Sequence, residues 1–223
     1  MNTQMHTHPH ETVTPTTGRT IRWAGHYDLF VNLLLFGQEK AFRKNIIRSA
    51  AIPSGAAVLD VGCGTGTLAL MAKEEVGEQG KVFGIDAAPE MIEVARQKSL
   101  QQNGDVNFQQ AVIEALPFED ATFDVVLSSL MFHHLPTDLK KKGLAEIYRV
   151  LKPNGRLLIV DMGRPTNFLQ HIGMALMLHG GMNDGIQDVV PLMKEASYTG
   201  IQLKNGWWGL LGSLQAQRSP ISS

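Results

Sequence analysis

The chain has 223 residues, of which 43% are hydrophobic and 18% charged, a composition typical of a globular protein and not of a disordered or fibrous one. Its formal net charge of −1 and pI near 6.7 lack the basic excess of a nucleic-acid-binding protein. Since no apolar run reaches the ~18 residues of a transmembrane segment and no signal-peptide pattern is seen, we expect a cytoplasmic protein with no nucleic-acid partner.

The first 50 residues divide into a tail and a helical cover. Residues 1–20 are rich in Thr, His and Pro without apolar periodicity, which predicts a disordered tail. Residues 21–223 are then expected to form a single domain. It begins, within residues 21–50, with two amphipathic helices, because apolar side chains recur there at steps of three and four. We expect the second helix over Glu39–Ala50, and both helices to pack on the core or cover its ligand site.

Strands and helices alternate in the middle of the chain. We expect strands over Ala57–Val61, Lys81–Asp86, Val106–Gln110, Phe123–Ser128 and Arg156–Val160. Helices are expected over Gly66–Glu75, Pro89–Leu100 and Leu139–Leu151, the last ended by Pro153-Asn154-Gly155. The apolar run of the fourth strand indicates burial on both faces. Repeated β-α units of this kind predict an α/β fold, a doubly wound, Rossmann-like, mainly parallel sheet of about seven strands.

The alternation ends after Asp161. Residues 162–185 are expected to form a helical insertion near the acceptor site, that is, the place where a second substrate would bind. A helix over Ile186–Ala196 should follow. Two strands near Ile201–Lys204 and Leu210–Gln217, joined by Asn205-Gly206, predict an antiparallel hairpin at the sheet edge. The run Lys140-Lys141-Lys142 is interpreted as a solvated helix face.

A glycine-rich turn follows the first predicted strand. Residues 58–70 read V-L-D-V-G-C-G-T-G-T-L-A-L, so Gly62, Gly64 and Gly66 alternate before a helix. Such a turn lets the backbone approach a ligand, and the helix directs its free N–H groups there. Dinucleotide-binding loops read G-x-G-x-x-G, whereas here Thr67 takes the third glycine position. Asp60 would repel a pyrophosphate but attract a cation, which favours S-adenosylmethionine over NAD.

Two further side chains near this turn have simple interpretations. Asp86 ends the second strand, where a carboxylate can accept hydrogen bonds from both ribose hydroxyls. Cys63, the single cysteine, is interpreted as a small packing residue, since no base neighbours it in the sequence.

Five motifs in order carry a family resemblance. V-L-D-V-G-C-G-T-G, G-I-D-A-A-P-E-M, A-L-P-F-E-D-A-T-F-D-V-V, H-H-L and E-I-Y-R-V-L-K-P-N-G-R-L-L-I-V-D resemble the successive motifs of class I S-adenosylmethionine-dependent methyltransferases. The similarity is closest to the ubiquinone/menaquinone-biosynthesis branch. It covers about residues 23–160 and the C-terminal third only in outline.

The resemblance implies a set of cofactor contacts. Asp60 would hold the amino group and Asp86 the ribose, with the three glycines along the methionine part. Val112 stands where the family commonly has an acid for the adenine amino group, so that contact would come from backbone or a neighbouring side chain. The implied cofactor-binding residues are Asp60, Gly62, Gly64, Gly66, Asp86, Ala87, Met91, Ile113, Glu114, Ser128 and Ser129.

Methyl transfer from a sulfonium needs alignment of the acceptor and exclusion of water, and a base only where the acceptor must lose a proton. His133 and His134 follow the fourth strand, and Tyr27 lies in the cover helices, so these three are the candidate catalytic residues. A structural role for the histidines is the alternative. No metal-binding constellation is visible, and the reaction requires none.

The expected activity is methyl transfer from S-adenosylmethionine, with S-adenosylhomocysteine as product, to a small hydrophobic or aromatic acceptor. A quinone-ring C-methyltransferase is an alternative within this class. An NAD-binding oxidoreductase and a catalytically silent S-adenosylmethionine-binding protein are alternatives from other classes. The sequence leaves the oligomeric state open, a homodimer included.

Overall fold

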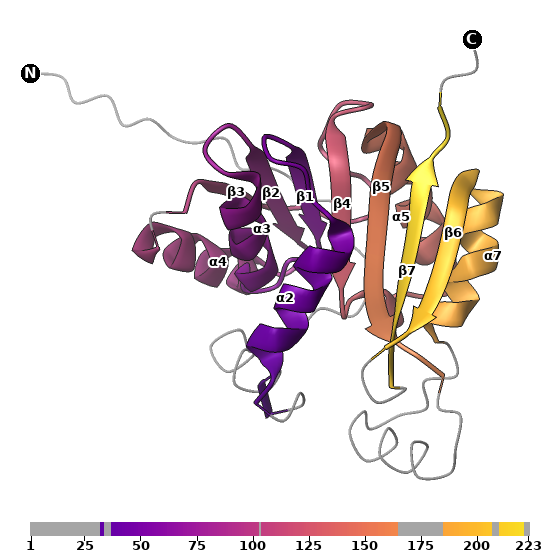
Figure 1. Cartoon of the computed structure of the whole chain (residues 1–223), viewed down its shortest axis with the longest axis horizontal. Helices are drawn as coiled ribbons and strands as arrows, with labels where there is room; N and C mark the ends of the chain where they lie inside the picture. The colour runs from indigo at the N-terminus through magenta and orange to yellow at the C-terminus, as the bar shows by residue number, and fades with distance from the viewer. Residues whose placement is uncertain (1–31, 34–36, 103, 165–184, 207–209, 221–223) are drawn as a thin grey trace, which may run out of the picture.

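The computed structural model describes residues 32–33, 37–102, 104–164, 185–206 and 210–220 (Figure 1). The predicted tail over 1–20, the candidate Tyr27, the first cover helix and most of the insertion predicted over 162–185 lie outside these ranges. Among the described residues, no helix has the length and apolarity needed to cross a membrane.

The core is a seven-stranded sheet in the order β3-β2-β1-β4-β5-β7-β6. The first five strands of this order run parallel, and β7 pairs antiparallel with both β5 and β6. The predicted α/β fold, with its antiparallel C-terminal pair, is confirmed. The strands are β1 (Ala57–Val61), β2 (Lys81–Asp86), β3 (Val106–Gln110), β4 (Phe123–Ser129), β5 (Leu151–Met162), β6 (Tyr198–Asn205) and β7 (Leu211–Arg218).

Helices cover both faces of this sheet, and the strands supply apolar side chains to each. In β1, Val58 packs in the core layer beneath α2, α3 and α4, while Leu59 packs in the layer beneath α5 and α7 (Figure 1). This alternation is the period of two expected of a strand buried on both faces. The helices are α2 (Glu39–Ala50), α3 (Thr67–Val76), α4 (Pro89–Gln101), α5 (Thr137–Val150) and α7 (Val189–Glu195), with 3₁₀ turns η1 (Phe132–His134) and η2 (Ile186–Asp188).

The largest difference from the sequence prediction is in β5. The expected strand Arg156–Val160 is longer, and Pro153-Asn154-Gly155 lies inside it instead of forming a separate turn. Pairing with β4 shifts between Phe123↔Leu151 and Val125↔Arg156, so these residues form an irregularity in the ladder. Asn154 has φ +63°, which Asn tolerates. Helix α5 therefore ends at Val150 and passes directly into the strand.

The C-terminal elements differ in smaller ways. The helix predicted over Ile186–Ala196 is a 3₁₀ turn followed by the short helix α7, with Pro191 in its first turn. Proline suits that position, because its nitrogen has no hydrogen to donate and the first turn requires none. Strand β6 begins at Tyr198, three residues before the predicted strand near Ile201.

Candidate functional site

The strand order reverses between β1 and β4, the two strands whose carboxyl ends flank the glycine turn. In open α/β sheets, ligands bind at the carboxyl edge beside such a reversal. Gly62, Gly64 and Gly66 have φ of +73°, +54° and +80°, values that side-chain-bearing residues rarely adopt. Helix α3 begins immediately afterwards at Thr67. The turn is therefore folded as its sequence predicts.

The glycines also allow close packing. A Cβ on Gly62 would lie 2.4 Å from Cγ of Met131, and one on Gly66 would lie 2.6 Å from Cζ of Phe108. Cys63 beside them is 7% exposed, and burial raises the pKa of its thiol well above the usual value. This agrees with a packing role for Cys63.

Asp60 lies in β1 just before the turn and is 1% exposed. Its Oδ2 has no hydrogen-bond partner among the described residues. Burial raises the pKa of Asp60 to about 7, the positive charge of Arg43 opposes the rise, and Asp86 adds to it. Arg43, on α2, is itself 8% exposed and pairs with Glu39 at 2.8 Å. The sequence prediction missed Arg43, because an arginine in an amphipathic helix carries no signal of burial.

Asp86 ends β2 and is joined to the glycine turn. Its Oδ2 accepts the Gly64 N–H at 2.9 Å and its Oδ1 accepts the Ala88 N–H at 2.9 Å. Burial raises the pKa of Asp86, and the N–H groups of Ala88, Gly64 and Ala87 oppose the rise. Each carboxylate oxygen has a second lone pair that can accept a hydrogen bond from a ligand.

Two more buried oxygens without described partners belong to Glu114 and Ser129. They follow β3 and end β4, so both lie at the same carboxyl edge as Asp60. A buried polar atom without a partner costs about 1–3 kcal/mol. Among the described residues, Asp60, Glu114 and Ser129 are the only side chains with such atoms. All three were predicted from the sequence to contact the cofactor.

The remaining predicted cofactor residues have other partners. Ser128 is 1% exposed and donates its hydroxyl to the Val61 carbonyl at 3.0 Å. The Ala87 carbonyl accepts Gln110 Nε2 at 3.0 Å. Met91 is buried beside Ala88. The Ile113 side chain lies against α5, where a Cβ on Gly143 would be 2.6 Å from it.

Beyond β4, the two candidate histidines occupy the 3₁₀ turn η1. His133 Nδ1 lies 2.6 Å from Oδ1 of Asp161, which the sequence prediction did not include. The ring centroid of His134 is 3.8 Å from that of His133. The sequence did offer a signal for Asp161, because it is an acidic residue near the end of a strand at this edge. Tyr27, the third candidate, lies outside the described residues.

The cavity beside His133 and Asp161 is small. It measures about 10 Å³, room for one water, and is lined by His133, Asp161 and Lys140 among others. Lys140 is 3% exposed, so the interpretation of the whole lysine run as a solvated face is wrong for this residue. Lys141 and Lys142 are exposed. Helix α5 places Lys140 one turn from its start, on the side facing the sheet.

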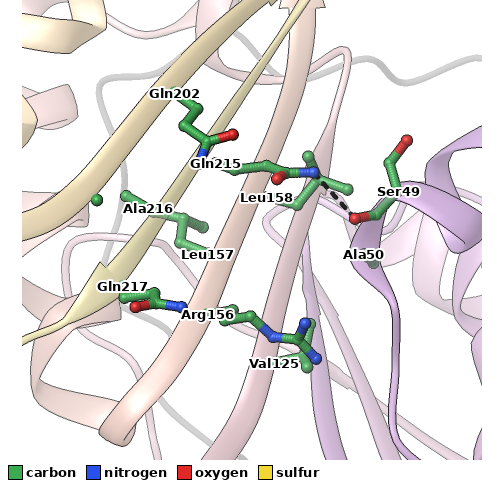
Figure 2. Close-up of a pocket in the computed structure, with 11 residues that line it drawn as sticks. Ser49, Ala50, Val125, Arg156, Leu157, Leu158, Gln202, Gln215, Ala216 and Gln217 are labelled. Atoms are coloured by element: carbon green, nitrogen blue, oxygen red, sulfur yellow. Dashed lines mark hydrogen bonds between the residues drawn. The ribbon is translucent and has the colours of Figure 1, made fainter.

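A larger cavity lies elsewhere. It measures about 70 Å³ and is lined by Arg156, Gln202, Gln215 and Gln217, beside the end of α2 (Figure 2). Gln215 there donates to the Ser49 carbonyl at 2.9 Å. This cavity lies over residues 156–158 in the middle of β5, and none of the predicted site residues lines it. Within the described ranges, no group of three or more His, Cys, Asp or Glu side chains could hold a metal ion.

Comparisons with known proteins agree with this geometry. A family model described as "Methyltransferase domain" matches residues 58–155. The ubiquinone/menaquinone biosynthesis C-methyltransferase of Marinomonas sp. is 38% identical over 148 residues, covering 66% of this chain and 58% of that protein. The demethylmenaquinone methyltransferase of Lactobacillus johnsonii is 34% identical over 154 residues, covering 68% and 62%. The chain thus spans about three fifths of the length of these relatives.

Solved structures support the fold. A S-adenosylmethionine-dependent methyltransferase from Aquifex aeolicus aligns with a TM-score of 0.64 and 24% identity, over 79% of this chain and 89% of that chain. Phosphoethanolamine N-methyltransferase 2 of Haemonchus contortus, in complex with S-adenosyl-L-methionine, aligns with a TM-score of 0.66 and 17% identity, over 80% and 52%. At these identities the likeness shows the fold alone.

Proposed function

Residues 58–155 belong to the methyltransferase-domain family, and from this premise we propose that the protein transfers a methyl group from S-adenosylmethionine to a small-molecule acceptor. One observation supports the proposal most strongly. Asp60, Glu114 and Ser129 each have a buried oxygen that finds no partner among the described residues, and all three lie along the edge where the strand order reverses. A ligand with several donors along its length would satisfy all three.

The residues fit the cofactor in charge and hydrogen bonding. Asp60 would accept its ammonium group, and the free lone pairs of Asp86 would accept the ribose hydroxyls. Glu114 would accept a hydrogen bond from the adenine amino group. It would replace the acid that the family commonly has at the position of Val112. Ser129 would border the sulfonium side, because the hydroxyl of Ser128 is already bonded to Val61. Ala87, Met91 and Ile113 would contribute apolar walls or backbone, and the glycines would admit the methionine part.

Bound S-adenosylmethionine supplies an electrophilic methyl carbon attached to a positively charged sulfur. The protein's contribution is to align the acceptor and exclude water, which can lower the barrier by about 7–11 kcal/mol. The acceptor we propose is a small hydrophobic or aromatic molecule. The names of the relatives favour a quinol ring. His133, His134 and Tyr27 stay the candidate catalytic residues.

Cofactor choice is tested by binding. Calorimetry should detect S-adenosylhomocysteine but not NAD, because Asp60 precedes the turn and Thr67 stands at the third glycine position. Asp86→Ala should lower the affinity for S-adenosylhomocysteine by at least about tenfold, since it removes the carboxylate that would accept hydrogen bonds from the ribose hydroxyls. Asp105→Ala, at an aspartate whose side chain is 97% exposed, should bind as wild type. Binding of NAD alone would overturn the proposal.

Catalysis is tested with labelled S-adenosylmethionine and a reduced naphthoquinol bearing a short prenyl chain. A labelled quinol product supports the quinone-ring alternative. Label in other aromatic acceptors supports the broader proposal. Cofactor binding with no labelled product from any acceptor would favour a catalytically silent binding protein.

A further inference from the structure

The side chain of His133 is held by a buried carboxylate. Its Nδ1 lies 2.6 Å from Oδ1 of Asp161, and its backbone N–H donates to Oδ2 of the same residue at 3.1 Å. Oδ1 also accepts the N–H of Met162 at 2.7 Å. The two side chains are 8% and 2% exposed. Asp161 thus fixes both the position and the ring orientation of His133.

These contacts determine which ring nitrogen of His133 carries the proton. Burial alone would raise the pKa of Asp161, but the charge of His133 and the hydrogen bonds from His133 and Met162 outweigh it and hold that pKa below its usual value. An ionised carboxylate can only accept, so Nδ1 of His133 must carry hydrogen. In neutral His133, the lone pair then resides on Nε2. Among the described residues, the hydrogen bonds of His133 use only Nδ1 and the backbone N–H.

The backbone carries this pair to the edge where the glycine turn lies. At the end of β4, Leu130 has φ +55°, a left-handed conformation that costs a non-glycine residue about 1–2 kcal/mol. Strain of this kind is concentrated at functional sites. The next residue, Met131, packs on Gly62, and η1 follows directly. His133 is therefore two residues from a side chain in contact with the turn.

We propose that His133 is the general base of the methyl transfer, acting through Nε2, and that Asp161 is the positioning residue that holds it in this form. The inference rests on the proposed function. The acceptor's electron pair forms the new bond to the methyl carbon while the pair of the breaking C–S bond stays on sulfur. The acceptor's proton moves to Nε2, the ionised Asp161 stabilises the resulting imidazolium, and the proton then passes to solvent.

This assignment narrows the acceptor class. A base assists only an acceptor whose nucleophilic atom must lose a proton, such as a phenolic or quinol hydroxyl, or a quinol ring carbon that loses its hydrogen. A tertiary amine or a thioether has no such proton. The acceptor is therefore a nucleophile that bears a proton, and within the proposed function it is an aromatic one.

The tautomer is tested by NMR of protein with ¹⁵N-labelled histidine in complex with S-adenosylhomocysteine. Wild-type His133 should show hydrogen on Nδ1 and none on Nε2. Asp161→Asn should reverse this, because an amide can donate to Nδ1. Hydrogen on Nε2 in neutral wild-type His133 would overturn the proposal. S-adenosylhomocysteine binding, measured by calorimetry, tests the proposed function separately, and Asp161→Asn should retain it.

The catalytic role is tested by kinetics with a reduced 1,4-naphthoquinol, a phenol and a tertiary amine. Asp161→Asn should lower kcat for the quinol or phenol by at least about 100-fold with KM unchanged. Asp138→Asn, the same change at an exposed aspartate of α5, should leave kcat unchanged. His133→Ala should lose kcat and regain part of it with added imidazole, and this variant serves if Asp161→Asn fails to fold. Methylation of the amine alone or of none of the three, or full activity in Asp161→Asn, would overturn the proposal.

Discussion

Asp60 is a buried carboxylate with a raised pKa, and it is proposed to contact the cofactor. It lies in a strand buried on both faces, and its carboxylate has an oxygen without a partner among the described residues. Burial raises its pKa to about 7, against the opposing charge of Arg43. Near neutral pH the carboxyl group of Asp60 is therefore present in both protonation states. Under the proposed function, the ammonium group of the cofactor would select the ionised form.

We predict that the affinity for S-adenosylhomocysteine rises with pH. Below pH 7 the raised pKa keeps Asp60 protonated, so only the ionised fraction binds the ammonium. The affinity should increase about tenfold between pH 6 and pH 8. Isothermal titration calorimetry measures this. Asp60→Asn should bind more weakly and lose most of the slope, whereas Asp105→Asn should keep it. An unchanged slope in Asp60→Asn would contradict the role given to this carboxylate.

At this scale, local sequence predicted the glycine turn, because strand ends and turns are readable from apolar runs and glycines. It also named, as cofactor contacts, the three residues whose oxygens lack partners among the described residues. It did not predict Asp161 or Arg43. Asp161 acts through a hydrogen bond to His133, 28 positions away, and Arg43 through its charge on Asp60, 17 positions away. No local sequence pattern encodes such pairings. The sequence alone suggested His133 and His134 equally as a base. Only the contact between His133 and the Asp161 carboxylate favours His133.

At the scale of elements, the start of α3 depends on the glycine turn. Gly66 is the N-cap, with φ +80°, and packs against Phe108 and Ala95. This one residue thus joins β1, β3, α3 and α4. Its lack of a side chain sets how closely the helix start approaches the sheet.

We predict that Gly66→Ala lowers the free energy of unfolding by about 2–4 kcal/mol, through both a left-handed φ and overpacking. Gly55→Ala provides the matched comparison. Gly55 has φ +76°, and a Cβ added to it would meet nothing within 4 Å, so this change should cost only about 1–2 kcal/mol. Urea denaturation of both variants measures the difference. Equal losses would show that packing at Gly66 contributes nothing.

Element boundaries were predicted well where apolar runs are bounded by turn residues. β1, β2, β3 and α2 match their predicted ranges. The failure in β5 has a physical cause. Pro153-Asn154-Gly155 has the composition of a turn. However, the residues before and after it, Leu151 and Arg156, both pair with β4, so the tripeptide becomes an irregularity within the strand. Tertiary pairing overrides local preference there.

At the scale of the whole molecule, the C-terminal hairpin pairs with the parallel core through β5 and β7, and one buried hydroxyl adds a hydrogen bond to the helix layer. Tyr198, at the start of β6, is 5% exposed and donates to the Leu144 carbonyl of α5 at 2.9 Å. Its ring also packs edge-on against Tyr148 at 5.1 Å. The antiparallel edge and the helix layer are thereby joined.

We predict that Tyr198→Phe lowers the free energy of unfolding by about 1 kcal/mol, the net worth of one buried hydrogen bond. Its affinity for S-adenosylhomocysteine should not change. Tyr148→Phe should be nearly neutral, because the ring contact is kept and the hydroxyl of Tyr148 forms no hydrogen bond with the described residues. Thermal denaturation tests both variants, and a larger loss in Tyr148→Phe would contradict this account.

The reversal of strand order between β1 and β4 has a consequence for engineering. The residues proposed to bind the methyl donor lie mainly on β1, β2 and the segment after β3, on one side of the reversal. On the other side, His133 follows β4 and Asp161 lies near the end of β5. Under the proposed function, each half would contact its own small molecule, and the two halves would share only the central edge. Directed evolution confined to the part of the second half that follows Ser129 should therefore select new acceptors while the proposed donor contacts are left unchanged.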